Sequence, residues 1–427
     1  MACSRRATTG KVSAVRSAFR WLGLAVAVLV PATAFARETQ PADGAAPSTR
    51  AEMWRRLRAE KATHLHAYVP KGIETFAIRF EDNILPRLTT PRSGFYPYVG
   101  RITPGGGFAL GPGYRLLDVA GGAEWTSSAA VSYRSYWQLD TRLTWLNLAH
   151  GRLFASTYGR YYRFPREHFY GIGPDSDEAN RTDFDYRQGA VGGTLGVRPT
   201  PWLAVAATTE YLRPHLAPGG DNRFPNAPEI FPPDRLPGFL EPHDYVHVEG
   251  FADVQTARPL LNPRKGGRYR AAIARYADRS GHDDGFTRYD VDLQQYASVL
   301  NERRVFVVRA LGSFSDVASD AQMPFYLMRT LGGNHTLRGF PDFRFRDRHQ
   351  IALQAEYRYE IFTALDGAVF YDAGQVAPRL DNFRWRDFER DWGVGFRFGG
   401  DGGVFLRLDV AFGGEGPRTW LRFGHVF

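Results

Sequence analysis

Alternation of apolar and polar residues is the clearest pattern in this chain of 427 residues. It is almost perfect over residues 350–361, QIALQAEYRYEI, where one face is polar apart from one alanine and the other face is apolar. A period of two residues is typical of a β-strand whose two faces have different surroundings. The same alternation marks residues 286–299, 391–399 and 404–412. These segments predict strands with an apolar face toward lipid and a polar face toward a wet interior.

From residue 93 onward the sequence alternates between strand and turn signals, without helical periods. We predict sixteen strands, at residues 94–103, 107–118, 123–134, 137–147, 152–164, 184–198, 201–213, 243–256, 267–277, 286–299, 303–314, 349–361, 364–372, 391–399, 403–412 and 418–427. The long connections follow odd-numbered strands, at residues 165–183, 214–242, 315–348 and 373–390. Short turns follow even-numbered strands, as in bacterial outer-membrane barrels. The predicted fold is therefore all-β: a sixteen-stranded antiparallel transmembrane β-barrel, closed because unpaired backbone groups are costly in lipid.

The barrel interpretation also decides where the charged strand residues point. An arginine facing lipid near the bilayer midplane costs roughly 2–4 kcal/mol. We therefore place Arg288, Arg358, Arg397 and Arg407 on the interior face. We expect these arginines to form mostly a solvated wall.

The first 36 residues have the features of a cleavable export signal: a basic lead, an apolar core at Trp21–Val30 and the cleavage pattern Ala34-Phe35-Ala36. The single cysteine, Cys3, lies in this segment, so we expect no thiol or disulfide in the mature chain. Removing the segment's five basic residues lowers the formal charge from +9 to +4, which gives no argument for nucleic-acid binding.

Residues 37–92 are predicted to be a linker ahead of a barrel at residues 93–427. Ser48–His66 has apolar residues at helical spacing, and Ile73–Phe80 is a possible strand. The helix is expected either to lie on the sheet or membrane surface or to plug the barrel, and both alternatives stay open.

The chain ends in an alternating strand with Leu421, Phe423 and Phe427 on one face, interrupted by His425. A terminal aromatic residue on such a strand resembles the signal by which outer-membrane barrels are passed to their assembly machinery. We expect this segment to direct the chain's own insertion.

Three further motifs resemble the BamA/TamA superfamily, the bacterial surface antigen family of sixteen-stranded outer-membrane barrels. They are Leu337-Arg338-Gly339-Phe340 in the long loop after the eleventh strand, Glu356 in the twelfth strand, and Phe370-Tyr371-Asp372-Ala373-Gly374 at the end of the thirteenth. Weaker support comes from residues 169–173 and 263–267. The resemblance covers residues 93–427.

The resemblance implies that the loop folds into the barrel and that its arginine pairs with acidic residues of the inner wall. Applied to this chain, it pairs Arg338 with Glu356 and Asp372, while Gly339 allows close approach to the wall and Phe340 wedges against it. The alternation agrees, since Glu356 lies on the polar face of its strand and Asp372 shares the parity of Asp366. Two roles stay open for this cluster: a brace for the barrel, or a working part of transport.

Members of the family that insert or secrete proteins carry periplasmic repeat domains ahead of the barrel. Residues 37–92 are too short for one such domain, so we expect a barrel-only member. The expected function is insertion or translocation of proteins or lipids at the bacterial outer membrane, through a weak seam between the first and last strands. The expected partners are the bilayer with its lipopolysaccharide and phospholipid, the assembly machinery, and a client polypeptide or lipid. The alternatives are a transport pore or receptor and a structural surface antigen.

Motifs of catalytic and metal sites are missing from the sequence: it has no G-x-S-x-G, no H-E-x-x-H and no cysteine ligand set. We therefore predict no enzyme activity, no cofactor and no metal. His282-Asp283-Asp284 has the residue types of a cation site, but we expect a solvated turn in an outer loop. Residues 175–178 lack the glycine and the terminal glutamate of a calcium loop.

Overall fold

The computed structural model describes residues 50–63, 93–260, 262–362, 364–400 and 403–423. The chain divides into two units, Met1–Pro70 and Lys71–Phe427. The predicted signal peptide, the possible strand at Ile73–Phe80 and the terminal Phe427 lie outside the described residues. Among the described residues, no helix is long and apolar enough to cross a bilayer.

In the first unit, the described residues form helix α2, Arg50–Thr63. Glu52 in its first turn and Lys61 in its last turn have the charges that the helix dipole favours at each end. Arg56 and Glu52 also form an exposed ion pair one turn apart, at 3.4 Å. The predicted N-terminal helix is therefore present.

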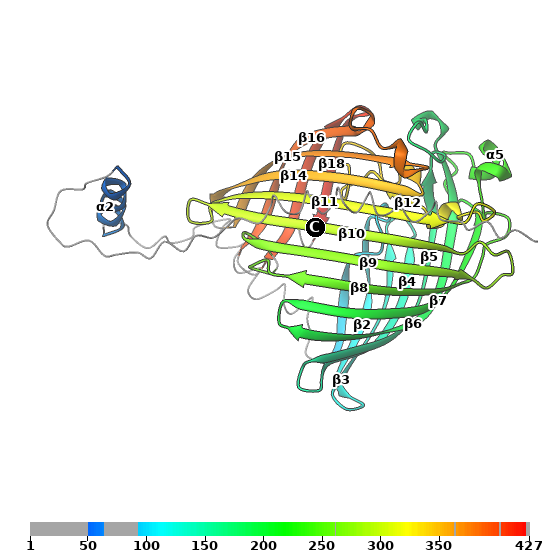
Figure 1. The fold of residues 1–427 in the computed structure, drawn as a ribbon, viewed down its shortest axis with the longest axis horizontal. Coiled ribbons are helices and arrows are strands. Elements are labelled where there is room, and N and C mark those ends of the chain that lie inside the picture. Colours follow the sequence, from blue (N-terminus) through cyan, green and yellow to red (C-terminus); the bar gives the residue numbers. More distant parts are fainter. Residues whose placement is uncertain (1–49, 64–92, 261, 363, 401–402, 424–427) are drawn as a thin grey trace, which may run out of the picture. The chain divides into compact units, whose positions relative to one another are not determined.

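The second unit is built on a single antiparallel sheet of sixteen strands that pair in chain order (Figure 1). They are β1 (Gly94–Arg101), β2 (Phe108–Val119), β3 (Ala123–Ser132), β4 (Trp137–Leu148), β5 (Leu153–Phe169), β6 (Thr182–Thr200), β7 (Leu203–Pro218), β8 (Tyr245–Gln255), β9 (Gly266–Asp278), β10 (Phe286–Val299), β11 (Arg304–Val317), β14 (His349–Phe362), β15 (Leu365–Ala377), β16 (Glu389–Gly400), β17 (Gly403–Gly413) and β18 (Gly416–Phe423). The predicted number and order of strands are confirmed. The predicted closure is not, because among the described residues β1 pairs only with β2 and β18 only with β17. An additional short hairpin, β12 (Arg329–Leu331) with β13 (Phe345–Asp347), was not predicted.

The four longest connections leave the same end of the sheet, which we call the loop end. They follow β5, β7, β11 and β15, and they contain the short helical turns of the second unit. These turns are η2 (Glu178–Asn180), α5 (Ala227–Ile230), η3 (Pro233–Arg235), η4 (Phe325–Leu327), η5 (Leu380–Asn382) and η6 (Trp385–Asp387). The opposite end has mostly short turns, such as the two residues between β6 and β7, and one longer connection, residues 256–265 between β8 and β9. The predicted parity of long and short connections is therefore present.

Burial along the strands is reversed relative to a soluble protein. In β14, Glu356 and Arg358 are buried at 2% and 1% exposure, whereas Ile361 on the other face is 46% exposed. Large apolar side chains are exposed along the outer face of the sheet, among them Val191, Leu195, Ile273, Phe306, Val369 and Trp392. An apolar outside and a polar inside are what a wall in contact with lipid requires.

The interior arginines do not form a solvated wall, and that interpretation is wrong. Arg358, Arg397 and Arg407 are each 1% exposed, and Arg288 is 7% exposed. Buried charges are tolerated when they are paired and hydrogen-bonded, because removing an unpaired ion from water costs much free energy. These side chains therefore belong to a packed interior.

Strands β5, β6 and β7 extend beyond their predicted ends at the loop end. The sequence prediction ends the fifth strand at Phe164, before Pro165. In the structure, β5 continues through Pro165, with a register shift between Phe164 and Glu167. A bulge of this kind accommodates a residue that lacks a backbone donor. Sequence alternation alone gives no sign of such a continuation.

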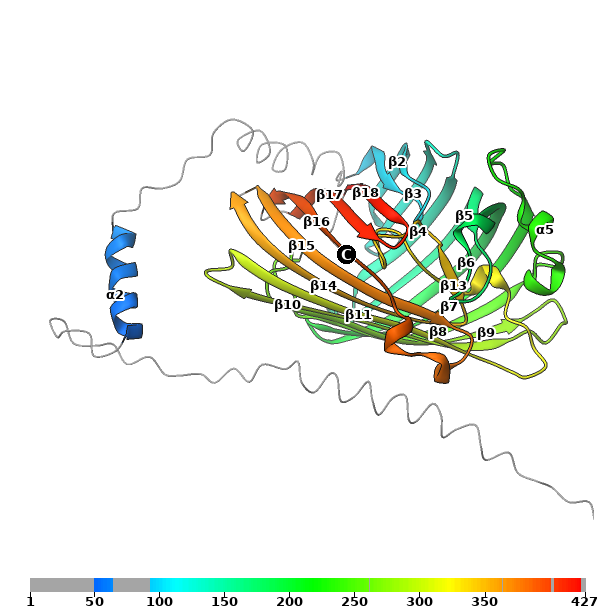
Figure 2. The ribbon, with the colours of Figure 1, turned by 90° about the horizontal axis from the view of Figure 1, so that it is seen from above.

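An aromatic cluster fills the loop end inside the sheet. Its centre is Phe325 in η4, which is fully buried with its ring 5.0 Å from the rings of both Phe169 and Phe184. Figure 2 shows the sheet curving around an interior in which β13 lies. The long connection between β11 and β14 therefore folds into the barrel.

Candidate functional site

The candidate site is built on the segment between β12 and β13, residues 332–344, which we call the interior loop. The backbone amide of Gly333 donates to the carbonyl of Phe340 at 3.0 Å and closes the loop on itself. Leu331 and Leu337 hold it to the wall in an apolar cluster with Phe340, Phe345, Ala352 and Val376. The loop is therefore a packed element with a fixed position against β14 and β15.

Arg338 lies at the tip of the interior loop with no exposed surface. Its Nε and Nη2 donate to the two carboxylate oxygens of Asp372, both at 2.6 Å, and its Nη1 donates to Glu356 Oε2 at 2.8 Å. The guanidinium also lies 3.4 Å from the ring centroid of Phe370. A forked, charge-assisted contact of this kind fixes orientation as well as position.

Glu356 is the hub of this charge cluster. Its Oε1 accepts from Arg358 Nε at 2.7 Å, and its Oε2 accepts from Arg397 Nη2 at 2.8 Å in addition to Arg338. The cluster thereby joins the interior loop to strands β14 and β16.

Asp409 of β17 extends the cluster further around the wall. Its carboxylate accepts from Arg397 Nη1 at 2.6 Å and from Arg407 Nε at 2.5 Å. Four arginines (338, 358, 397 and 407) thus contact three carboxylates (Glu356, Asp372 and Asp409). A further buried carboxylate, Asp391, is the direct cross-strand partner of Asp372.

Gly339 is where the interior loop touches β17. A Cβ atom at this position would lie 2.5 Å from the Cβ of Asp391 and 2.8 Å from the Cα of Gly413. Phe340 is 2% exposed and packs edge-on against Phe345, with the ring centroids 5.3 Å apart. The structure therefore brings the five residues of the predicted loop cluster together on one side of the interior.

The interior loop also contacts both end strands of the sheet. Arg101 of β1 donates to the side-chain oxygen of Asn334 at 3.0 Å, and Arg422 of β18 donates to the backbone oxygen of Asn334 at 3.3 Å. Trp420 of β18 donates from Nε1 to the carbonyl of Arg338 at 2.6 Å. Arg101 also contacts the ring of His335. We call this set of contacts the seam latch.

Sequence reasoning missed the seam latch, although one signal was present. Trp420 and Arg422 alternate with Leu421, so strand parity directs them inward. No local pattern connects Trp420 to Arg338 or Arg422 to Asn334. Each pair is more than eighty positions apart and meets only because the loop folds back.

The residues of the predicted C-terminal assembly signal are only partly described. Leu421 is 58% exposed on the outer face, and Phe423 is the last residue of β18. Phe427 lies outside the described residues.

Asp342, Asp347 and Glu415 have raised pKa values. Burial raises the pKa of Asp347 to about 6, although the backbone amide of Arg348 acts in the opposite direction. Burial also raises the pKa of Asp342, which Arg101 partly offsets, and that of Glu415, which Arg344 partly offsets. The loop end therefore contains acids that are harder to ionise than free ones.

Comparisons with known proteins place the charge cluster within a matched family domain. Residues 259–417 match the Omp85 superfamily domain, a range that contains the whole charge cluster from Arg338 to Asp409. A search of curated proteins finds no match to the chain.

Solved structures of similar fold include BamA from Haemophilus ducreyi lacking POTRA domains 1–3, with 11% identity over 78% of this chain and 69% of that one, at a TM-score of 0.57. CdiB from Acinetobacter baumannii matches at 11% identity over 77% of this chain and 56% of its own, with a TM-score of 0.41. CdiB from Escherichia coli matches at 12% identity over 78% and 60%, with a TM-score of 0.47. The fold comparison rests on BamA, and it confirms the resemblance to barrels of the BamA/TamA type. Residues 259–417 therefore match the Omp85 superfamily domain, and the fold is similar to that of BamA.

Proposed function

We propose that this chain is an outer-membrane barrel that assists the insertion or translocation of proteins, or of lipids, through the seam between β1 and β18. One observation carries the proposal. Among the described residues, β1 pairs only with β2 and β18 only with β17, while the seam latch contacts both end strands.

The length of the first strand supports a weak seam. β1 has eight residues, compared with nineteen in β6. An unpaired strand edge is a template for adding another strand. In lipid, each unsatisfied backbone group costs several kcal/mol, so the seam is the part of the barrel that gains most from a client strand.

The seam latch supports a mechanism in which the seam opens and closes. Its contacts with the end strands are a few polar side-chain bonds, which are individually weak compared with a full strand ladder. The charge cluster around Glu356 joins the interior loop to the last strands and is almost completely buried. In the proposed mechanism the charge cluster keeps the interior loop in place while the seam contacts exchange.

In this proposal the chain lies in the bacterial outer membrane, and a cleavable signal peptide directs its export. Its apolar outer face would contact lipopolysaccharide and phospholipid, and its last strand would engage the assembly machinery. The client is a polypeptide or a lipid. The proposal involves no nucleic acid, no cofactor and no catalytic step.

The experiment is reconstitution of the mature chain in liposomes, followed by the folding rate of a small unrelated outer-membrane barrel added from urea. Cysteine pairs introduced along Gly94–Arg101 and Gly416–Phe423 are linked with a bismaleimide, since the chain's own cysteine, Cys3, lies in the predicted signal peptide. The matched control links Ala271→Cys to Val291→Cys, which are register partners in β9 and β10. We expect faster client folding with the unlinked protein and with the control link.

Loss of the acceleration only in the seam-linked protein supports the proposal. Equal acceleration with the seam linked refutes entry at the seam. No acceleration in any form, from a barrel that itself folds normally, refutes insertase activity and favours the pore alternative, which single-channel conductance with solute selectivity would then test.

A further inference from the structure

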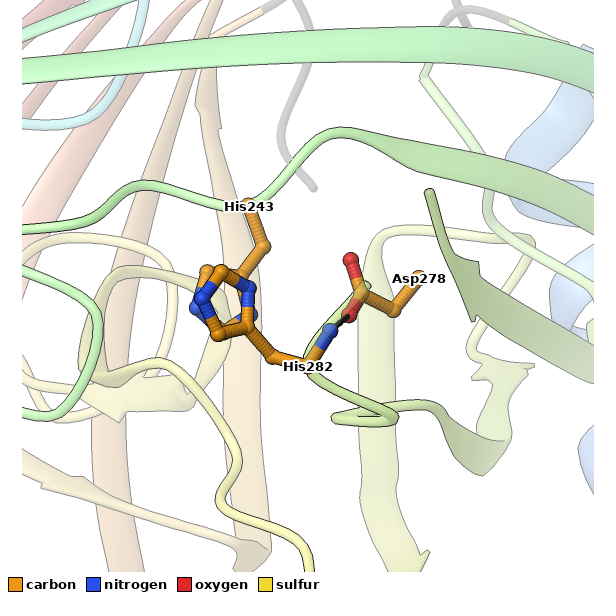
Figure 3. Close-up of side chains that lie close together, drawn as sticks. All are labelled: His243, Asp278 and His282. Atoms are coloured by element: carbon orange, nitrogen blue, oxygen red, sulfur yellow. Dashed lines mark hydrogen bonds between the residues drawn. The ribbon is translucent and has the colours of Figure 1, made fainter. Parts of the chain in front are cut away.

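Two histidines stack face to face at the loop end, away from the interior loop. His243 lies two positions before the first residue of β8, and His282 lies in the turn between β9 and β10. Their ring centroids are 4.5 Å apart, with an angle of 10° between the rings (Figure 3). Asp278, the last residue of β9, completes a group in which one ligand atom from each side chain lies within 4.8 Å of the others.

The His243 side chain is buried and incompletely satisfied. It is 6% exposed, and its Nδ1 makes no hydrogen bond with the described residues. The nearest acid is Asp284, whose Oδ2 is 3.4 Å from that nitrogen. Buried polar atoms are almost always hydrogen-bonded, so a buried nitrogen left over beside a second imidazole requires a partner.

The turn that carries His282 is held in place by its own backbone. The two carboxylate oxygens of Asp278 accept from the amides of Ser280 and His282, at 2.8 and 2.9 Å. The amide of Asp244 donates to Ser280 Oγ at 2.7 Å, which ties the turn to the segment that carries His243. The two histidines therefore face each other from connected backbones.

More carboxylates surround the pair than the three-residue group contains. Glu241 Oε2 lies 3.2 Å from His282 Nε2, and the Asp284 carboxylate lies beside His243. Two imidazole nitrogens with one or two carboxylate oxygens form a donor set that suits Zn²⁺ and neighbouring transition metals, whereas Ca²⁺ and Mg²⁺ prefer oxygen ligands alone.

We propose that His243, His282 and Asp278 bind a transition-metal dication of the Zn²⁺ class, with Asp284 or Glu241 as a further ligand. Zn–N bonds of roughly 2.0–2.1 Å bring ligand atoms of a tetrahedral site to about 3.3 Å from each other. Because imidazole lone pairs lie in the ring plane, the stacked His282 ring must rotate out of the stack to share an ion with His243, and its side chain is 43% exposed, which leaves room for this rotation. The metal ties the long connection between β7 and β8 to the turn between β9 and β10.

The sequence alone favoured a solvated turn at His282-Asp283-Asp284, because nothing in that triplet indicates a second histidine. His243 is 39 positions earlier and reaches the turn only through the pairing of β8 with β9. The proposal is independent of the seam and of the proposed transport function.

The test is equilibrium dialysis of the folded protein, without a histidine tag, against Zn²⁺, together with the visible absorption of bound Co²⁺. We expect one equivalent of metal and a Co²⁺ spectrum of low coordination number. The exposed His282→Ala change should weaken binding at least tenfold without affecting folding, and His243→Ala should do the same. The matched control is His215→Ala, which removes an exposed histidine of β7 outside the group.

Two results would overturn the proposal: no binding at one equivalent by the unaltered protein, or the same affinity in His282→Ala as in His215→Ala. If His243→Ala fails to fold, the comparison of His282→Ala with His215→Ala decides the question alone.

Discussion

The backbones of Gly339 and Gly413 are in direct contact: a Cβ on Gly339 would lie 2.8 Å from the Cα of Gly413. The converse also holds, since a Cβ on Gly413 would lie 2.8 Å from the carbonyl oxygen of Gly339. The interior loop reaches β17 because both positions lack a side chain. Arg338, the preceding residue, then lies close enough to contact two strands of the wall.

A methyl group should therefore displace the loop. We expect Gly339→Ala to destabilise the folded barrel by about 1–3 kcal/mol, the usual cost of overpacking a closed interior. Thermal or urea unfolding in detergent measures the change. The matched control is Gly414→Ala, because a Cβ at Gly414 meets nothing within 4 Å. Equal stability of the two variants would show that the glycine contact does not limit the position of the loop.

Replacing Arg338 distinguishes the two possible roles of the charge cluster, which are a brace for the barrel and a working part of transport. Arg338→Ala leaves Glu356 and Asp372 buried with fewer partners, and we expect a loss of about 3–5 kcal/mol. Arg338→Lys keeps the charge but not the fork, so it should restore only part of this stability. Unfolding free energy and client-folding rate are measured on the same preparations.

If the cluster only braces the barrel, Arg338→Ala should have low stability and a low folding yield, with normal activity per folded molecule. Normal yield with lost activity would contradict the brace and indicate a working part of transport. Arg303→Ala is the control, since Arg303 forms an ion pair with Glu360 while being 67% exposed.

The seam latch predicts energetic coupling between β1 and the interior loop. In a double-mutant cycle, Arg101→Ala and Asn334→Ala should be non-additive by about 0.5–3 kcal/mol, because each removes the same hydrogen bond. The exposed Arg303–Glu360 pair should give only about 0–1 kcal/mol in the same cycle. Additive effects of Arg101→Ala and Asn334→Ala would mean that the latch does not hold the seam.

Asp347 predicts a pH dependence of stability. Burial raises its pKa from 3.8 to about 6, so the folded state holds a proton that the unfolded state releases. The contribution of protonated Asp347 to the free energy of unfolding is therefore complete below about pH 4. It is lost as the pH rises through about 6, by about 3 kcal/mol in total. Asp347→Asn should remove this loss and stabilise the protein above pH 7.

Urea unfolding at pH 4.5 and pH 8 gives the comparison. The control is Asp381→Asn in the loop after β15, where the side chain is 75% exposed. An Asp347→Asn variant that keeps the full pH dependence of the original protein would contradict this assignment.

The alternation of apolar and polar residues predicted most of the strands. The contacts that it did not predict were missed for physical reasons. Alternation gives the face of a residue, so Glu356 and Asp372 were correctly directed to the interior. It does not give the neighbour across the sheet, which depends on strand register, so the pairing of Arg397 with both Glu356 and Asp409 was not foreseen. The same limit explains why the interior arginines were taken to be solvated.

Contacts made by loops were harder to predict than contacts made by strands. Asn334 contacts β1 and β18 because the connection between β11 and β14 folds inward, and no period in its sequence encodes that path. The family resemblance supplied the inward fold of the loop and the partners of Arg338. It did not supply the contacts at the seam.

The last prediction tests whether the outer face contacts lipid. Val369 lies in β15 with 47% exposure, and its register partner Val394 in β16 is 43% exposed on the same face. A charge on a lipid face costs roughly 2–4 kcal/mol near the bilayer midplane and about 0–1 kcal/mol near its surfaces. We expect Val369→Arg to lower stability in liposomes by the larger amount, and Val299→Arg, at the turn end of β10, by the smaller. Unfolding free energies of the two variants in liposomes measure the difference. Equal effects would mean that the outer face at Val369 is not in the hydrocarbon, and the placement of the barrel in a membrane would then fail with it.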